Sequence, residues 1–133
     1  MALTELHEIL YCSVLADDQS PTVVGQIVTH ARARNPGRGI TGLLVFDGMR
    51  FCQHIEGPRN AVLELVSSME MDVRHADMRV VYDGALLQRR YQRFDMGLAE
   101  GDDVTGLAEI YTLDGQVALD RFLALRSGFD VSG

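Results

Sequence analysis

The segment from Gly39 to Gly57, GITGLLVFDGMRFCQHIEG, constrains the fold more than any other part of this chain. It predicts two strands joined at positions 47–48, because Asp-Gly between apolar runs is a strong hairpin signal. The first strand is apolar at both alternating sets of positions, which predicts burial on both faces of a sheet. In the second strand Gln53 shares one face with Phe51 and Ile55. A buried amide needs hydrogen-bond partners, and we expect a ligand to provide them.

The rest of the chain supplies further strands and helices around this hairpin. Hydrophobic periodicity predicts strands over Glu8–Val14, Met78–Leu87 and Phe94–Ala99. Residues typical of helix ends predict a helix from an N-cap at Ser20 to Asn35, which Pro36 follows, and a second helix that begins at 57–58. Two short helices are predicted over Leu107–Leu113 and Gln116–Arg126, the second with Asp114 as its N-cap. The order β-α-β-β-α-β-β with a helical tail predicts an α+β, ferredoxin-like sandwich with two helices on one sheet face. We expect residues 1–100 to form the main domain and 101–133 a helical cap or output segment.

Composition limits the class of protein. The chain has 133 residues, enough for one domain with a core, and its net charge of −7 argues against nucleic acid and anionic membranes as partners. Apolar runs are too short for a membrane helix, and acidic residues stand where a signal peptide carries basic ones, so we expect a cytoplasmic protein. The two cysteines, Cys12 and Cys52, fall in strands and are expected to be reduced packing thiols.

Several polar residues stand among apolar neighbours in a recurring pattern. The motifs are Tyr11-Cys12-Ser13, Ala31-Arg32 followed by Asn35, Gly39–Leu44, Phe51 with Gln53 and Glu56–Pro58, Asp72 with Arg74 and His75, and Met96-Gly97. In these motifs and their order the chain resembles the BLUF family of blue-light receptors that bind FAD. The resemblance extends over about residues 7–100, within the usual size of one domain. Phe94 stands where the family often has Trp, Val73 where it has Pro, and Arg34 where relatives carry Asn or His.

The resemblance implies a function and a set of site residues. It implies that Tyr11, Gln53 and Met96 are photoactive. It also implies that FAD is held by Tyr11, Ile27, Val28, Arg32, Asn35, Gln53, Ile55, Arg74 and His75, with Val62 as a further apolar wall. Separately, we expect no metal, because no metal-ligand spacing is present. Excited flavin would take an electron and a proton from Tyr11, and Gln53 would then rotate or change tautomer. The protein would be a sensor and not an enzyme, acting on an unknown downstream partner or through its own homo-oligomer.

Two other classes of protein remain open at this point. One is an acylphosphatase-like hydrolase on the same fold, although the loop at 15–20, LADDQS, is acidic where a phosphate site would be glycine- or arginine-rich. The other is a flavin-free interaction module. Cys52, His54 and His75 could be imagined as metal ligands, but their spacing matches no metal-binding motif. The colour of the purified protein distinguishes a flavin receptor from both alternatives.

Overall fold

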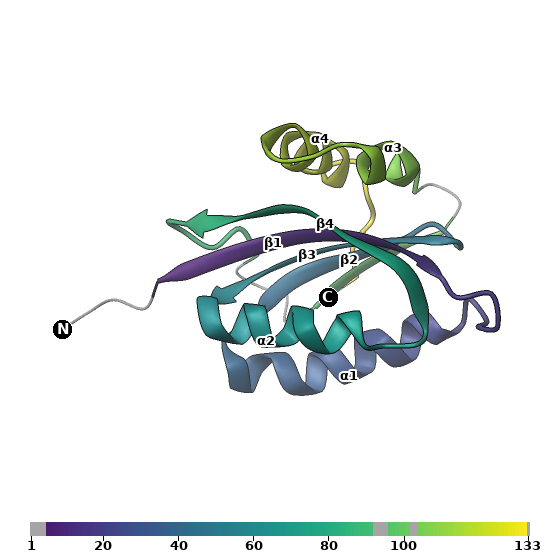
Figure 1. Ribbon diagram of the computed structural model, residues 1–133, viewed down its shortest axis with the longest axis horizontal. Helices are drawn as coiled ribbons and strands as arrows, with labels where there is room; N and C mark the ends of the chain where they lie inside the picture. The colour runs from purple at the N-terminus through teal and green to yellow at the C-terminus, as the bar shows by residue number, and fades with distance from the viewer. Residues whose placement is uncertain (1–4, 92–95, 102–103, 133) are drawn as a thin grey trace.

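A five-stranded sheet separates two helical layers in the computed structural model, which describes residues 5–91, 96–101 and 104–132 (Figure 1). The elements in chain order are β1 (Leu6–Leu15), α1 (Val23–Arg38), β2 (Thr41–Phe46), β3 (Arg50–Pro58), α2 (Arg59–Glu70), β4 (His75–Leu86), β5 (Gly97–Glu100), α3 (Leu107–Thr112) and α4 (Gln116–Arg126). Helices α1 and α2 lie on one face of the sheet, and α3 and α4 lie on the other (Figure 1).

The strand order confirms the predicted ferredoxin-like arrangement. The sheet runs β4-β1-β3-β2-β5, with β1 antiparallel to both β3 and β4, and β2 antiparallel to β3. The first four strands and two helices therefore form two interleaved β-α-β units on one sheet. The fifth strand adds to the edge of β2 in the parallel direction. This arrangement places β1 and β3, the two strands with the most notable polar residues, at the centre.

The predicted hairpin is confirmed, and its turn fixes the register of the sheet. Asp47 Oδ1 accepts hydrogen bonds from the backbone N–H groups of Met49 and Arg50, at 2.9 and 2.7 Å. Gly48 has φ +99°, a left-handed conformation that suits glycine. The turn pairs Phe46 with Phe51, whose rings stack with centroids 4.4 Å apart. From there the register carries each β3 side chain to a defined face of the sheet.

The ends of two helices differ from the prediction. Helix α1 begins at Val23 with Thr22 as N-cap, because Ser20 sits in the preceding turn. It does not end at Asn35 but continues through Pro36 to Arg38, since a proline removes one N–H without stopping the last turn. The left-handed Gly39, with φ +69°, ends it instead.

Helices α3 and α4 lie where the sequence predicted them, but details of the C-terminal prediction were wrong. Helix α4 has Gly115 as its N-cap, without a side-chain capping hydrogen bond, so Asp114 does not cap it. Strand β5 covers 97–100, one residue beyond the predicted end at Ala99. Phe94, at the start of the predicted strand, lies outside the described residues, whereas Met96 is buried just before β5.

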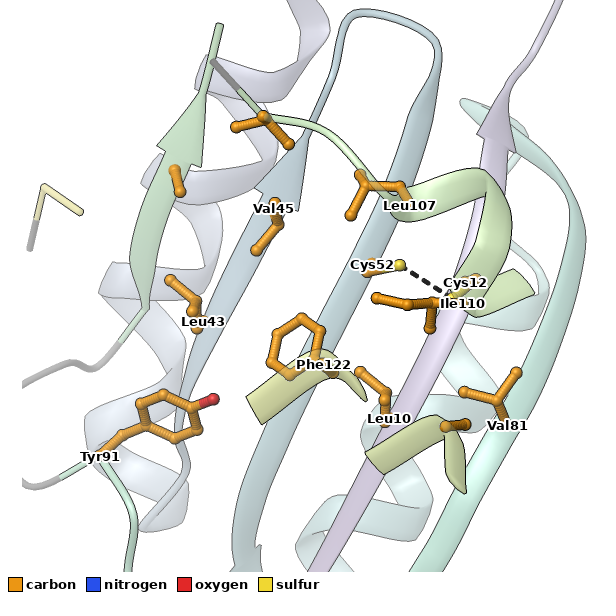
Figure 2. Close-up of a cluster of buried hydrophobic side chains, with 13 residues drawn as sticks. Leu10, Cys12, Leu43, Val45, Cys52, Val81, Tyr91, Leu107, Ile110 and Phe122 are labelled. Atoms are coloured by element: carbon orange, nitrogen blue, oxygen red, sulfur yellow. Dashed lines mark hydrogen bonds between the residues drawn. The ribbon is translucent and has the colours of Figure 1, made fainter. Parts of the chain in front are cut away.

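Both faces of the sheet are buried, each in its own core. The α1–α2 side contains Ile9, Val24, Val28, Ile40, Leu44, Phe46, Phe51, Ile55, Val62, Val66 and Met96. The opposite core, between the sheet and α3–α4, contains Leu10, Cys12, Leu43, Val45, Cys52, Val81, Tyr91, Ala99, Val104, Leu107, Ile110, Ala118 and Phe122, most of which Figure 2 labels. The free thiols of Cys12 and Cys52 meet across β1 and β3 in this second core. Strand β2 is thus buried on both faces, as its sequence predicts.

Candidate functional site

A buried pair of polar side chains lies at the centre of the sheet, on its α1–α2 face. Tyr11 of β1 and Gln53 of β3 are directly opposite in the antiparallel register. The Tyr11 hydroxyl donates a hydrogen bond to Oε1 of Gln53, and the two residues are only 4% and 1% exposed. Burial raises the pKa of Tyr11 far above its ordinary value, so the phenol is protonated throughout the physiological range.

The nitrogen end of the same amide faces Met96. Gln53 Nε2 donates to the Met96 sulfur at 3.5 Å. Tyr11 and Met96 are therefore protein partners of this amide, and the expectation that a ligand also bonds to it stays a prediction. A thioether is a weak acceptor, however, and a carboxamide nitrogen carries two hydrogens. The amide thus keeps capacity to donate to a further group.

A cavity of about 360 Å³ opens between α1, α2 and the sheet, with Tyr11 and Gln53 in its wall. Its lining combines apolar side chains with amides, imidazoles and guanidinium groups. The lining residues are Tyr11, Ile27, His30, Ala31, Arg34, Asn35, Arg38, Leu44, Phe51, Gln53, Leu65, Ser68, Met69, Met71, Asp72, Arg74 and His75. This volume is within the roughly 300–1,000 Å³ typical of small-molecule pockets.

Charged groups at the start of β4 shape one side of the cavity. Arg74 and Asp72 form an ion pair with Nη2 and Oδ2 2.6 Å apart. The hydrogen bond from Arg74 holds the pKa of the Asp72 carboxyl below its usual value and raises that of the guanidinium. His75 Nε2 contacts the Met69 carbonyl, which can only accept, and its Nδ1 meets the Ser13 hydroxyl at 2.8 Å. These contacts fix the His75 ring beside Tyr11, with centroids 6.1 Å apart.

The family description "Sensors of blue-light using FAD", abbreviated BLUF, matches residues 6–97 of this chain. The chain belongs to the BLUF family. The matched span contains Tyr11, Gln53 and Met96, together with every residue that lines the cavity. The buried pair and the cavity beside it are therefore features of a BLUF fold.

Characterised relatives are longer proteins with different outputs. The blue light- and temperature-regulated antirepressor BluF of Escherichia coli K12 is 31% identical over 104 residues, covering 74% of this chain and 26% of that protein. Photoactivated adenylate cyclase subunit beta of Euglena gracilis is 33% identical, covering 66% of this chain and 10% of that protein. The chain thus spans about a quarter or less of these relatives, which include both a regulator and an enzyme.

Solved BLUF structures share the fold. BlrB, a BLUF protein in its dark state, is 31% identical with a TM-score of 0.69, covering 74% of this chain and 75% of that one. Klebsiella pneumoniae BlrP1, whose structure is described with FMN and cyclic diGMP, is 27% identical with a TM-score of 0.66, covering 90% of this chain and 30% of that one.

The residues predicted to bind the cofactor fall into three groups. Those in the cavity wall are Tyr11, Ile27, Asn35, Gln53, Arg74 and His75. Val28 and Ile55 lie instead in the adjoining apolar core, as does Val62. Arg32 points to backbone carbonyl groups, donating to those of Met96 and Ser132. The flavin contacts of all these residues remain predictions.

Other lining residues were not singled out by sequence reasoning. On α1, His30 and Arg38 join Ile27 and Arg34 at three- or four-residue spacing, which places them on one helix face. This spacing was available in the sequence. Leu65, Ser68 and Met69 form the corresponding face of α2. Arg34 is also part of the cavity wall.

The opposite face of β3 carries a second buried polar network. His54, fully buried, meets Oε1 of Glu8 through Nε2 at 2.7 Å and the hydroxyl of Tyr91 through Nδ1 at 2.6 Å. A carboxylate only accepts, so Nε2 carries the hydrogen and Nδ1 accepts from the phenol. Burial is the main influence on His54 and lowers its pKa, which favours this neutral form. The Phe122 ring of α4 packs edge-on against the imidazole, with centroids 5.5 Å apart.

Arg90 completes the network around Glu8. Its Nε donates to Oε1 of Glu8 at 2.9 Å. Burial raises the pKa of the Glu8 carboxyl, but hydrogen bonds from His54 and Arg90 outweigh it and lower the pKa overall. Within the described residues, no three histidine, cysteine or acidic side chains are grouped as metal ligands. Each helix of the described part of the chain is too short or too polar to span a membrane.

Proposed function

We propose that this chain is a blue-light receptor that binds FAD non-covalently in the cavity between α1, α2 and the sheet. In this proposal it signals to a protein partner and catalyses no reaction on a substrate. The observation that carries the proposal is the buried Tyr11–Gln53 pair in the cavity wall, with Met96 behind the amide. We further propose that residues 1–100 bind the flavin and that 101–133 transmit the signal.

The lining of the cavity fits a flavin. The polar edge of an isoalloxazine ring presents acceptors together with one N–H donor, and the Asn35 and Gln53 amides can both donate and accept. Apolar side chains such as Ile27 and Leu65 suit the faces of a flat ring. Arg74 is already paired with Asp72, so we assign the phosphate end to the other two guanidinium groups of the wall, Arg34 and Arg38.

Tyr11 and Gln53 are arranged to move a proton. When bound, the flavin supplies an absorber of blue light that accepts an electron in its excited state. Tyr11 stays protonated in the dark because burial raises its pKa, and its proton becomes labile only if the ring is oxidised. Oε1 of Gln53 already contacts that proton and can receive it.

The amide can then rearrange, and the rearrangement changes its contact with Met96. In a rotated carboxamide, oxygen replaces Nε2 opposite the Met96 sulfur, and the hydrogen bond seen here is lost. The two amide arrangements must lie within a few kcal/mol of each other, as any two-state switch requires. Return of the electron and the proton to Tyr11 restores the covalent and redox state of the protein, so the dark and lit forms differ only in the arrangement of the amide.

Cofactor identification tests the binding part of the proposal. The purified protein should be yellow, and chromatography of the cofactor released by denaturation should give FAD. Release of FMN alone would correct the identity of the flavin. A colourless protein that takes up neither added flavin would support a flavin-free interaction module instead.

Two substitutions test the photochemical part. Gln53→Leu and Tyr11→Phe should each abolish the reversible red shift of the flavin spectrum under blue light, while flavin remains bound. Tyr111→Phe makes the same chemical change outside the cavity, at a hydroxyl bonded to the Asp77 carbonyl, and should switch normally. A normal red shift in Gln53→Leu or Tyr11→Phe would contradict the proposed roles.

A further inference from the structure

Strand β5 is the last strand of the described sheet, and its outer edge is covered by a segment that follows α4. The Leu98 N–H donates to the Ser132 carbonyl at 2.7 Å, and the Ser132 N–H donates to the Leu98 carbonyl at 2.9 Å. Both backbone groups of Leu98 thus face away from β2. Unpaired groups on a sheet edge are sites of strand pairing, and here Ser132 occupies them.

Arg32 of α1 connects this bridge to the residue before β5. Its Nε donates to the Met96 carbonyl at 2.9 Å, and its Nη2 donates to the Ser132 carbonyl at 3.1 Å. One guanidinium group therefore holds two carbonyls from chain segments far apart in sequence. A lysine, with a single ammonium group, cannot reproduce this fixed fork.

Met96 links these contacts to the photoactive pair. Its sulfur accepts from Gln53, whose Oε1 accepts from Tyr11, while its carbonyl accepts from Arg32. A continuous series of hydrogen bonds thus joins Tyr11 to Ser132. A movement of Met96 changes the position of the carbonyl that Arg32 holds.

We propose that residues 131–132 form a latch on the edge of β5, that Arg32 is the positioning residue that keeps it closed, and that blue light opens it by displacing Met96. The light-driven part of this inference rests on the proposed function. In the dark the latch covers the pairing groups of Leu98. In the light those groups become free, and the β5 edge becomes the surface that changes between the two states.

Residue-resolved amide exchange at Leu98 tests the latch in the flavin-loaded full chain. In the dark, Arg32→Lys and Ser132→Pro should each speed Leu98 exchange by about tenfold, the effect of losing about one hydrogen bond of ordinary strength. Ser132→Pro removes the N–H that donates to Leu98. Arg59→Lys, at an exposed position, should exchange as the parent does. So should Ser132→Ala, which keeps both backbone bonds and loses only the long hydrogen bond of 3.4 Å from its hydroxyl to the Leu98 carbonyl.

Continuous blue light should raise Leu98 exchange in the parent to the level of Ser132→Pro, and leave Leu10 in the sheet centre unchanged. A normal red shift with unchanged Leu98 exchange would overturn the latch and leave the receptor proposal intact. An absent red shift would overturn the receptor proposal, while the dark comparison would still test Arg32. If Arg32→Lys lost flavin but kept parental Leu98 exchange, Arg32 would be a cofactor ligand and the latch would be wrong.

Discussion

The stability of this protein should fall on mild acidification because His54 is buried in its neutral form. In the folded state burial lowers its pKa, whereas in the unfolded chain it titrates near its ordinary value of about 6.5. Below that pH the unfolded state binds a proton that the folded state does not. The free energy of unfolding then decreases by about 1.36 kcal/mol per pH unit.

The loss works out at about 1.4 kcal/mol between pH 7.5 and pH 5.5 if the folded imidazole stays neutral over this range. The pKa of Glu8 is lowered from 4.5, so its contribution to stability is present above that pH and is lost only as the pH falls below it. The range from pH 7.5 to pH 5.5 therefore reports the protonation of the imidazole and not that of its carboxylate partner.

Urea unfolding at the two pH values measures this difference. His54→Gln should be less stable than the parent at both pH values. Its free energy of unfolding should lack the decrease of about 1.4 kcal/mol, because the variant has no imidazole at this position to bind a proton in the unfolded state. His30→Gln removes an exposed imidazole and should retain the drop. An NMR titration of the parent provides an independent check, since His54 should remain neutral at pH 5.5. Equal drops in His54→Gln and the parent, or a protonated His54 at pH 5.5, would refute the reasoning.

Two further substitutions test the packing of the sheet. Phe122→Ala should lower the free energy of unfolding in urea by about 3–5 kcal/mol, because the ring is fully buried between α4 and the sheet. As its control, Val117→Ala changes a side chain that is 62% exposed on the same helix and should alter the free energy of unfolding by less than about 0.5 kcal/mol. Gly42→Ala should destabilise the protein, since the new Cβ would lie 2.5 Å from the His54 backbone oxygen, whereas Gly25→Ala in α1 meets nothing within 4 Å and should stabilise it. A Phe122→Ala or Gly42→Ala variant with the same free energy of unfolding as the parent would contradict the described packing.

The parts of the fold that could be predicted depend on signals close together in the sequence. The Asp-Gly turn and the alternating strands around it predicted the hairpin and the double burial of β2. The end of α1 depends on a conformation that composition does not show. Pro36 suggested a stop at Asn35, but the helix ends where Gly39 adopts a left-handed φ.

The site was predictable in its residue types and less so in its contacts. Tyr11 and Gln53 could be named, but their pairing follows from the long-range register of β1 with β3. Arg32 was expected to contact the cofactor, whereas its hydrogen bond to Ser132 joins residues 100 positions apart. Hydrophobic periodicity along the sequence cannot predict a hydrogen bond between residues so far apart.

The alternation along β3 has a consequence for how proteins of this architecture can diverge. Gln53 faces the cavity, and His54, the next residue, faces α4. Substitutions at Cys52 and His54 therefore alter the packing against α3 and α4 without replacing a cavity side chain, and those at Phe51 and Gln53 do the reverse. A lineage can thus change the α3–α4 layer while keeping its cavity side chains, because the two sets of selective constraints lie on different faces of one strand.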